Sequence, residues 1–583
     1  MMKPILTHLT DTLFLATGDQ RSQSLLSLIF ILTVWGTAIC SAQKTGDWRN
    51  IEEGIVIPTP GMKYADQPYV VRTKDGTWIC ALTVGTLGET VKGSRNFSAV
   101  TTSRDQGKTW SPFIECNRTY AIPFEALSGR IYTITPGAFT WSDDGCRTWS
   151  QPVRIPQFTK YLGWGVGMPV LVDGEMIYPW AMVALSRPPR KTEVFFLKSR
   201  NIYTEQDLGK IDWKLLPADG KGLKGPDWDQ PESRSEEPHV VVLNNRSLYC
   251  VFRTDQGYIG NSVSSDGGNT WSKPDALRYG PGERMIKNPL ACPSLWKCSN
   301  GNYLLFFHNH NGRDYRERNP AWISGGVEKD GMIVWSEPEI LLYSDDLTYH
   351  SGRLSYPGFL EDGGQYYLFE TQKTTARMHQ LDASLLEGCW NQASNKTLTT
   401  DGLKVELTAA RIQANREIAL PKFRDFTNGW NQDFRTGMTI ELWIRFNSFR
   451  NGQVILENYL DNGIGLGITV NKDHSIRLTM NDGRTESSWP CDPVLKTGEL
   501  QHLAIVIDGG PKTISYILNG KFLDGGEYRQ YGWGRYHPVL LNVRGRTKTT
   551  LAPGLDGEIK TVRIYDRALR TSEVAGNYRA GWK

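Results

Sequence analysis

Three stretches of the chain repeat one eight-residue pattern, Ser-x-Asp-x-Gly-x-Thr-Trp, and they begin at Ser103, Ser142 and Ser264. The second copy departs from the pattern at one position, where Cys146 stands in place of Gly. In tight turns, Ser and Asp side chains bond to the nearby backbone and Gly supplies a positive φ. Such a repeat usually marks a repeated supersecondary unit. The pattern therefore predicts a turn that closes a recurring β-hairpin, with the Trp packed beneath it.

Residues 47–390 alternate short β-branched or aromatic runs with turn residues. Several runs follow an Asp-Gly or Asn-Gly pair, as at Asp75-Gly76, Asn300-Gly301 and Asp362-Gly363, and such pairs are strong hairpin signals. No long segment keeps a helical period. A chain of 583 residues is also too long for one ordinary core. The sequence therefore predicts an all-β protein of two or more domains.

Residues 397–583 form a second β-rich region. The stretch Met438–Phe446 alternates strictly, so its residues divide between the two faces of a strand. A hairpin turn is expected at Asn519-Gly520. The face predicted to be apolar carries Ile440, Leu442, Ile444 and Phe446, and the opposite face carries Glu441, Trp443 and Arg445.

The longest apolar run, Leu25–Ile39, ends in the small residues Ser41 and Ala42. We interpret residues 1–42 as a secretory signal peptide and expect a secreted or periplasmic protein. Two alternatives are a membrane anchor, for which the run is short, and a lipoprotein site at Cys40, for which Ile39 is too bulky. With the signal removed, no integral membrane domain is expected.

The net charge of +4 gives no reason to expect nucleic acid as a partner. The chain has nine Cys residues, and Cys292 with Cys298 is a candidate local disulfide in an exported protein. No Cys or His spacing indicates a zinc site, and no cofactor or metal is expected.

The eight-residue repeat resembles the Asp-box (BNR repeat) of sialidases, or neuraminidases, where it closes hairpins on the rim of a β-propeller. The second region resembles a laminin-G/concanavalin-like jelly roll. About 340 residues at roughly 50 to 60 per four-stranded blade correspond to six blades. The resemblance thus implies a six-bladed β-propeller at 47–390 with a C-terminal β-sandwich (jelly roll) at 397–583. Jelly rolls of this kind often bind glycans, and a purely structural brace is the alternative.

The same resemblance suggests where the active site lies. In sialidases a Glu opens a strand and an Arg ends the next one sixteen residues later, as Glu237 and Arg253 do here before the third Asp-box. Glu237 is then the general base, with Glu236 as a weaker substitute, and Arg253 binds a substrate carboxylate. Tyr356 matches the nucleophile and Glu370 a supporting carboxylate. A Tyr hydroxyl needs an adjacent base, because its ordinary pKa is near ~10.

Sialidases place another carboxylate-binding Arg between these two stretches. Arg318 matches it best, and Arg316 is the second choice. Guanidinium groups suit carboxylates, because two parallel N–H bonds match the two oxygens. His308 is a further candidate for lining the pocket. The alternative for both arginines is a solvated surface loop.

The chain departs from the sialidase pattern in its first repeat. Sialidases begin it with Arg-Ile-Pro, and here Asp66-Gln67-Pro68 stands in that place. An Asp in the place of this Arg repels a carboxylate instead of binding it. The loop before the first Asp-box carries Glu89 as its carboxylate, so Asp66 and Glu89 are both candidates for the general acid.

These features predict a secreted, exo-acting glycoside hydrolase that resembles exo-α-sialidases. It would remove a terminal acidic sugar from glycoproteins, glycolipids or polysaccharides, with retention through Tyr356 and Glu237. The alternatives are a hydrolase for a non-sialic sugar, a non-catalytic glycan-binding protein, and a propeller polysaccharide lyase.

Overall fold

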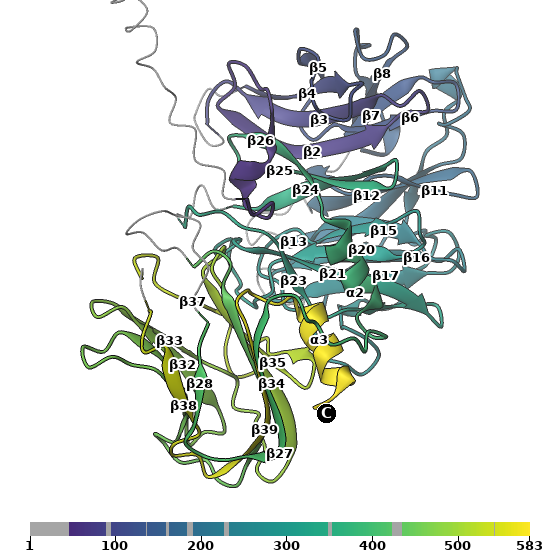
Figure 1. Cartoon of the computed structure of the whole chain (residues 1–583). Coiled ribbons are helices and arrows are strands. Elements are labelled where there is room, and N and C mark those ends of the chain that lie inside the picture. Colours follow the sequence, from purple (N-terminus) through teal and green to yellow (C-terminus); the bar gives the residue numbers. More distant parts are fainter. Residues whose placement is uncertain are drawn as a thin grey trace, which may run out of the picture. The chain divides into compact units, whose positions relative to one another are not determined.

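The computed structural model describes residues 46–88, 95–135, 137–158, 162–183, 191–226, 233–347, 353–421, 434–540 and 543–582. The expected signal peptide at 1–42 and the candidate acid Glu89 lie outside these ranges. From Thr45 onward the chain forms one unit by its internal contacts. Strands dominate the described residues, as predicted (Figure 1). No helix among them is long and apolar enough to span a membrane.

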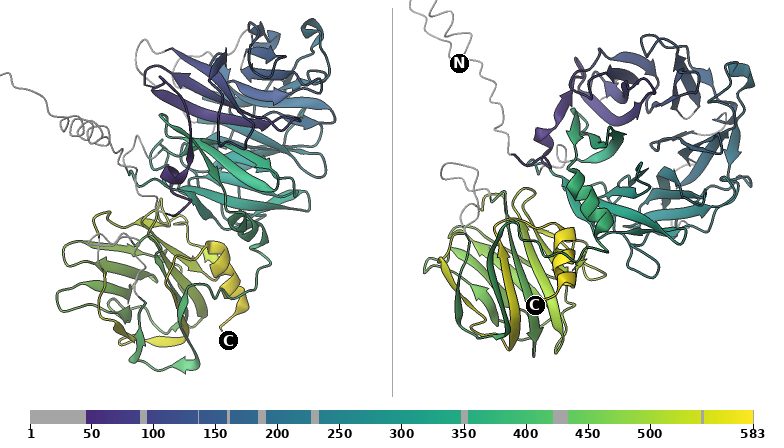
Figure 2. Two further views of the ribbon diagram at one scale, coloured as in Figure 1. Left: turned by 45° about the horizontal axis from the view of Figure 1, so that its top comes forward. Right: turned by 45° about the vertical axis from the view of Figure 1, so that its right-hand side comes forward.

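Strands β1–β26 form five hydrogen-bonded sheets in the described residues, and these fall into six groups when the nine-stranded sheet is divided at the parallel pairing of β13 with β15. We call these strands together the sheet ring (Figure 2). The first group comprises β2 (Tyr64–Arg72), β3 (Trp78–Gly85), β4 (Asn96–Ser103) and β5 (Ile114–Asn117). The second comprises β6 (Ile122–Glu125), β7 (Ile131–Thr135), β8 (Ala138–Ser142) and β9 (Val153–Arg154). The third comprises β10 (Leu162–Trp164), β11 (Val170–Val172), β12 (Glu175–Val183), β13 (Lys191–Ser199) and β14 (Lys214–Leu216).

The fourth group comprises β15 (Ser233–Val242), β16 (Leu248–Thr254), β17 (Ile259–Ser264) and β18 (Asp275–Ala276). It is joined to the third by parallel pairing of β13 with β15. The fifth comprises β19 (Ser294–Lys297), β20 (Tyr303–Phe307), β21 (Ala321–Lys329), β22 (Met332–Trp335) and β23 (Glu339–Leu342). The last comprises β24 (Ser355–Asp362), β25 (Gln365–Thr371), β26 (Ala376–Gln380) and the N-terminal β1 (Ile55–Ile57).

Neighbouring groups pack against one another until the last meets the first. Strand β2 contacts β6, β12 contacts β15, β15 contacts β19, and β19 contacts β24, which returns to β2. An apolar cluster that contains Tyr132 and Trp180 joins the second group to the third. The right-hand view in Figure 2 shows the groups arranged around a common centre. Residues far apart in sequence therefore meet at that centre.

The Asp-box prediction is confirmed in atomic detail. In the first copy, the Ser103 hydroxyl bonds to Asp105 at 2.9 Å and accepts the Gly107 N–H at 2.8 Å, while Asp105 accepts the Thr109 N–H at 2.9 Å. The third copy repeats these bonds. In the second copy Cys146 takes the glycine position with φ of 69° and donates its N–H to Ser142 at 2.9 Å. The motif therefore forms the same turn even without its glycine.

Strands β27–β39 and helix α3 form what we call the two-sheet region. One sheet contains β27 (Leu403–Ile412), β39 (Gly557–Tyr565), β29 (Met438–Phe446), β34 (Leu500–Asp508), β35 (Thr513–Leu518), β36 (Lys521–Phe522) and β37 (Gly534–Arg535). The other contains β28 (Arg416–Ala419), β38 (Lys548–Leu551), β30 (Val454–Glu457), β31 (Gly465–Val470), β32 (Ile476–Asn481) and β33 (Glu486–Pro490). One apolar core includes residues of both sheets.

The alternation predicted along β29 is confirmed. Its apolar face is buried in the core between the two sheets. The opposite face is covered as well, since Glu441 bonds to His502 and to Asn577 of helix α3 (Thr571–Ala580). Trp443 stacks on Tyr578 of the same helix at 5.8 Å. The polar face of β29 is therefore part of a second, partly polar interior.

The sequence did not predict helix α3 or helix α2 (Ala383–Asn391), which follows β26. Both are short, and the apolar pattern of a short helix resembles that of a buried strand. The candidate disulfide is also wrong, because Cys292 and Cys298 are both buried free thiols. Every other cysteine of the described residues is likewise free and buried.

Candidate active site

Three strands of the sheet ring carry the same irregularity near their first residues. The pairing register of β2, β15 and β24 with the next strand skips two residues, and in each case the second of these is a proline. The residue before each proline has a left-handed backbone, with φ of 55° at Gln67, 52° at Glu237 and 53° at Tyr356. Such bulges redirect a side chain, and non-glycine residues in this conformation concentrate at functional sites.

The bulges at Glu237 and Tyr356 bring these two side chains together. The Tyr356 hydroxyl donates a hydrogen bond to Glu237 Oε1 at 2.8 Å. Arg253, on β16, donates from Nη1 to Glu237 Oε2 at 2.7 Å and to the Tyr356 oxygen at 3.4 Å. Three residues that the sequence selected from separate strands thus form one hydrogen-bonded group.

Glu236 joins this group through its ion pair with Nη2 of Arg253. It is fully buried and accepts a bond from Thr192 at 3.3 Å. Burial is the largest influence on the pKa of Tyr356, which lies well above its ordinary value, and the nearby Glu237 carboxylate raises it further. The Tyr356 phenol is therefore neutral at physiological pH and has a carboxylate within reach to accept its proton.

Tyr315 lies among three guanidinium groups beside this group. The carbon centres of Arg318, Arg253 and Arg234 lie 5.5, 5.6 and 5.8 Å from the centroid of its ring. Arg318 is buried and donates from Nη2 to the Leu290 carbonyl at 2.7 Å, whereas Tyr315 is 37% exposed. The ring therefore covers the arginines on a side that solvent reaches, and the sequence reasoning did not select it.

Asp66 also lies near Tyr356, where it is paired with a lysine. Lys373 forms an ion pair with Asp66, and its Nζ lies 4.8 Å from the centre of the Tyr356 ring. Asp66 also accepts bonds from Tyr64 at 2.9 Å and Thr371 at 3.3 Å. Lys373 therefore offsets the negative charge that Asp66 brings to this position.

We call Tyr356, Glu237, Glu236, Arg253, Arg318, Tyr315, Asp66 and Lys373 together the Tyr356 cluster. Gln67 occupies the third bulge, is 4% exposed, and has a buried side-chain oxygen with no hydrogen-bond partner in the described residues. The sequence contained a signal for this position, because Gln67, Glu237 and Tyr356 all precede a proline near the start of a strand.

Other residues selected from the sequence lie elsewhere. Glu370, on β25, is buried and contacts Gln372, His379 at 3.4 Å and Arg377 at 3.9 Å. His379 and Arg377 belong to the neighbouring strand β26. Glu370 lies opposite Arg377 in the pairing of β25 with β26. Arg316, the second choice for the carboxylate-binding arginine, has a side chain that is 75% exposed and forms an ion pair with Asp314 at 3.8 Å.

His308, the further candidate for the pocket, is fully buried near Arg318. Burial lowers its pKa well below the ordinary value, and the charge of Arg318 adds to this effect. Its ring packs edge-on against Phe306 with centroids 5.3 Å apart. His308 is therefore a neutral packing residue behind the arginine. The described residues contain no group of three or more His, Cys, Asp or Glu that could hold a metal ion.

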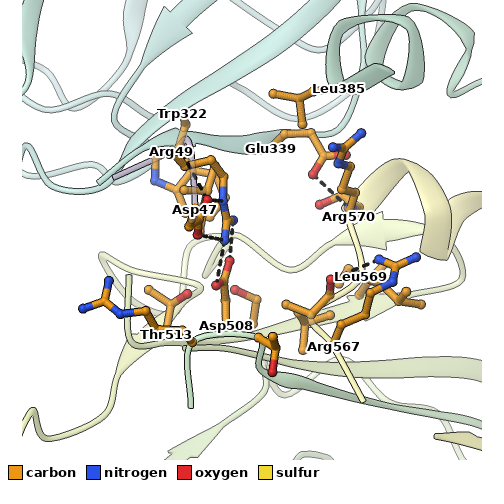
Figure 3. Close-up of a pocket in the computed structure, with 18 of the residues that line it drawn as sticks. Asp47, Arg49, Trp322, Glu339, Leu385, Asp508, Thr513, Arg567, Leu569 and Arg570 are labelled. Carbon is orange, nitrogen blue, oxygen red and sulfur yellow. Dashed lines mark hydrogen bonds and ion pairs between the residues drawn. The ribbon is translucent and has the colours of Figure 1, made fainter. Parts of the chain in front are cut away.

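A cavity of about 330 Å³ lies where the two-sheet region meets the sheet ring (Figure 3). Arg49 lies between Asp47 at 2.8 Å and Asp508 at 2.7 Å. Glu339 accepts the backbone N–H groups of Thr571 and Ser572 at the start of helix α3. These contacts join the N-terminal segment and the sheet ring to the two-sheet region.

Comparison with known proteins supports the two-part organisation. Residues 128–368 match the BNR repeat-like domain, and residues 417–575 match the Concanavalin A-like lectin/glucanases superfamily. The chain therefore contains a BNR repeat-like domain followed by a concanavalin A-like domain, and this prediction is confirmed. No curated protein gives a significant match.

Several solved structures are similar to the chain. A mutant of Trypanosoma rangeli sialidase displaying trans-sialidase activity is 15% identical, with a TM-score of 0.39, 90% of this chain and 96% of that chain covered. The intramolecular trans-sialidase from Ruminococcus gnavus is 14% identical, with a TM-score of 0.42 and coverage of 57% and 98%. The Hadza microbial sialidase Hz136 is 18% identical, with a TM-score of 0.41 and coverage of 58% and 68%.

Proposed function

We propose that this protein is a glycoside hydrolase of the sialidase superfamily that removes a terminal acidic sugar from glycans with retention of configuration. The observation that carries the proposal is the 2.8 Å hydrogen bond from the Tyr356 hydroxyl to the Glu237 carboxylate. A neutral Tyr activated by a carboxylate is a recognised exception to the use of two acids in glycosidases. It avoids placing a carboxylate nucleophile against an anionic sugar.

The proposal includes an architecture. We infer that the six strand groups are the blades of a β-propeller at residues 47–390, and that residues 397–583 fold as a β-sandwich of the jelly-roll type. Removal of a signal peptide at residues 1–42 would release the protein outside the cytoplasm. The Tyr356 cluster then lies where the first strands of the blades converge.

In the first proposed step the Tyr356 oxygen attacks the anomeric carbon while its proton passes to Glu237. The bond to the leaving glycosidic oxygen breaks, and a general acid protonates that oxygen. We propose Glu89 for this acid rather than Asp66, because three donors already bond to the Asp66 carboxylate. The product of this step is a sugar linked covalently to Tyr356.

In the second step water attacks the anomeric carbon and the bond to Tyr356 breaks. The deprotonated acid takes a proton from the water, and Glu237 returns its proton to the Tyr356 oxygen. Arg253, which bonds to both residues, stabilises the negative charge that moves between them. Two displacements at one carbon give net retention.

We propose an acidic substrate because cations surround the nucleophile. Arg253 and Arg318 share the ring of Tyr315, and Lys373 lies over the ring of Tyr356. Lys373 supplies a positive charge near the position where sialidases have an Arg and this chain has Asp66. A sugar carboxylate that displaces part of the Asp66–Lys373 pair would find a cation there.

A release assay on sialylated and uronate-containing glycans tests the proposal. Wild-type protein is expected to release a free acidic sugar, and the Tyr356→Phe variant is expected to release none above background. Unchanged release by the variant would exclude Tyr356 as the nucleophile. A product with the ultraviolet absorbance of an unsaturated sugar would indicate a lyase instead.

A further inference from the structure

We propose that the two-sheet region helps to build the substrate site, because one of its loops positions the segment that carries Tyr315 and Arg318. We call residues 309–320 the site arm and residues 524–536 the support loop. The arm belongs to the sheet ring, between β20 and β21, whereas the support loop precedes and includes β37. What the arm binds rests on the function proposed above, but its support by this loop does not.

The support loop contacts the arm at both of its ends. At the start, Trp533 donates its indole N–H to the Asn309 carbonyl at 3.1 Å. At the end, Arg535 donates from Nη2 to the Asn319 carbonyl at 2.7 Å. Buried backbone carbonyls need such partners. The two contacts therefore hold both ends of the segment whose middle presents Tyr315.

His310 connects the support loop to the inside of the arm. Its Nε2 lies 2.9 Å from the Glu317 carbonyl, which can only accept, so Nε2 carries the proton. Its Nδ1 is then the acceptor for the Gly312 N–H at 3.2 Å and for the Gln530 amide at 3.2 Å. Burial lowers the pKa of His310 to about 4, which keeps this single arrangement at neutral pH.

The ring of Tyr531, in the support loop, stacks on His310 with ring centroids 4.7 Å apart. Further contacts hold the support loop in place. Its Arg529 forms an ion pair with Asp492 at 2.8 Å and lies 4.7 Å over the Trp489 ring. Lys287 of the sheet ring donates to the Arg529 carbonyl at 2.9 Å. The loop is therefore a rigid support rather than a loose contact.

Tyr356 and Glu237 lie on β24 and β15, outside the arm. Loss of the support should therefore weaken binding of the substrate more than it slows the chemical step. Gln530, Trp533 and Arg535 are positioning residues in this account. They act on the substrate through Tyr315 and Arg318.

The test uses the full chain with Gln530→Met and Trp533→Phe, which remove one donor each and keep most of the packing. The control is Lys521→Met, which breaks an exposed ion pair with Glu283 at 2.9 Å, also between the two-sheet region and the sheet ring. Amide hydrogen exchange of residues 309–320 is measured in each variant. Steady-state kinetics use 4-methylumbelliferyl glycosides of sialic acid and of glucuronic acid.

Gln530→Met and Trp533→Phe are each expected to speed amide exchange in the arm. Each should also raise KM roughly fivefold to tenfold, with kcat within about twofold of wild type. The control should change neither quantity. If wild type turns over neither glycoside but exchange in the arm rises, the proposed substrate class fails and the support of the arm stands. Unchanged exchange in both variants would overturn the inference, as would an equal effect of Lys521→Met.

Discussion

The hydroxyl oxygen of Tyr356 lies 2.8 Å from Oε1 of Glu237, although 119 residues separate the two in sequence. Each residue precedes a proline, opens a bulge and has a left-handed backbone. Such a conformation costs of order 1–3 kcal/mol at each residue and persists only where the surrounding structure enforces it. The rest of the fold therefore offsets the cost of holding a phenol against a carboxylate.

If Tyr356 and Glu237 act as one unit, their loss should not be additive. We expect Tyr356→Phe and Glu237→Gln each to lower kcat by at least ~100-fold, and the double variant to lower it little further. Tyr366→Phe, on β25, is the matched control and should leave kcat unchanged. Losses that multiply in the double variant would show that the two residues act independently.

Lys373 and Asp66 should depend on each other for stability. Lys373→Met leaves the Asp66 carboxylate buried without its ion-pair partner, which typically costs about 3–5 kcal/mol. Adding Asp66→Asn should recover most of that loss, as urea unfolding would measure. If Lys373 contacts the substrate, KM of the stable double variant for an acidic glycoside should still rise roughly tenfold. A KM equal to wild type would restrict Lys373 to a structural role.

Buried histidines should make the protein less stable in mild acid. Burial lowers the pKa of His239 to about 3 and that of His310 to about 4, below the ordinary 6.5. At pH values between the folded and the unfolded pKa of each histidine, the unfolded chain therefore binds more protons than the folded chain. The free energy of unfolding consequently decreases as the pH falls below 6.5. Each histidine contributes a slope of up to about 1.4 kcal/mol per pH unit.

The variant His239→Gln tests this slope. The free energy of unfolding, measured by urea between pH 6 and pH 4, should fall about 1 kcal/mol less per pH unit than in wild type. Equal slopes in the two proteins would mean that His239 is not held neutral by the fold.

Gly107 of the first Asp-box should not tolerate a side chain. It has φ of 80°, and an added Cβ would lie 2.4 Å from the Met378 sulfur and 3.2 Å from the Trp78 ring. Gly129 is the matched control, with φ of 85° and nothing within 4 Å of an added Cβ. We expect Gly129→Ala to lose about 1 kcal/mol from backbone strain and Gly107→Ala to lose about 1–3 kcal/mol more from overpacking. Equal losses in thermal unfolding would contradict the packing role of this turn.

The repeated turns and the alternation along β29 could be read from the sequence because both depend on neighbouring residues. Glu237, Arg253 and Tyr356 could be selected through the resemblance to sialidases, and the third Asp-box set the register of Glu237 and Arg253. Lys373 could not, since its partner Asp66 lies 307 residues away and in another strand group. Its own neighbours in sequence give no sign of the ion pair.

Arg316 and Arg318 show the same limit within one loop. They are two residues apart, and only the burial of Arg318 against the Leu290 carbonyl separates their roles. Arg318 follows Glu317, whose carbonyl bonds to His310, and His310 in turn bonds to Gln530 of the support loop. The repeated X-Pro step at Gln67, Glu237 and Tyr356 was, by contrast, a local signal that the sequence did contain.

Covalent trapping tests the central claim most directly. Full-length protein is incubated with a fluorinated glycosyl fluoride of the acidic sugar that it releases, then digested and analysed by peptide mass spectrometry. The account predicts one glycosyl adduct, on Tyr356, which Tyr356→Phe abolishes. An adduct on another residue, or turnover that inverts the anomeric configuration by NMR, would contradict it.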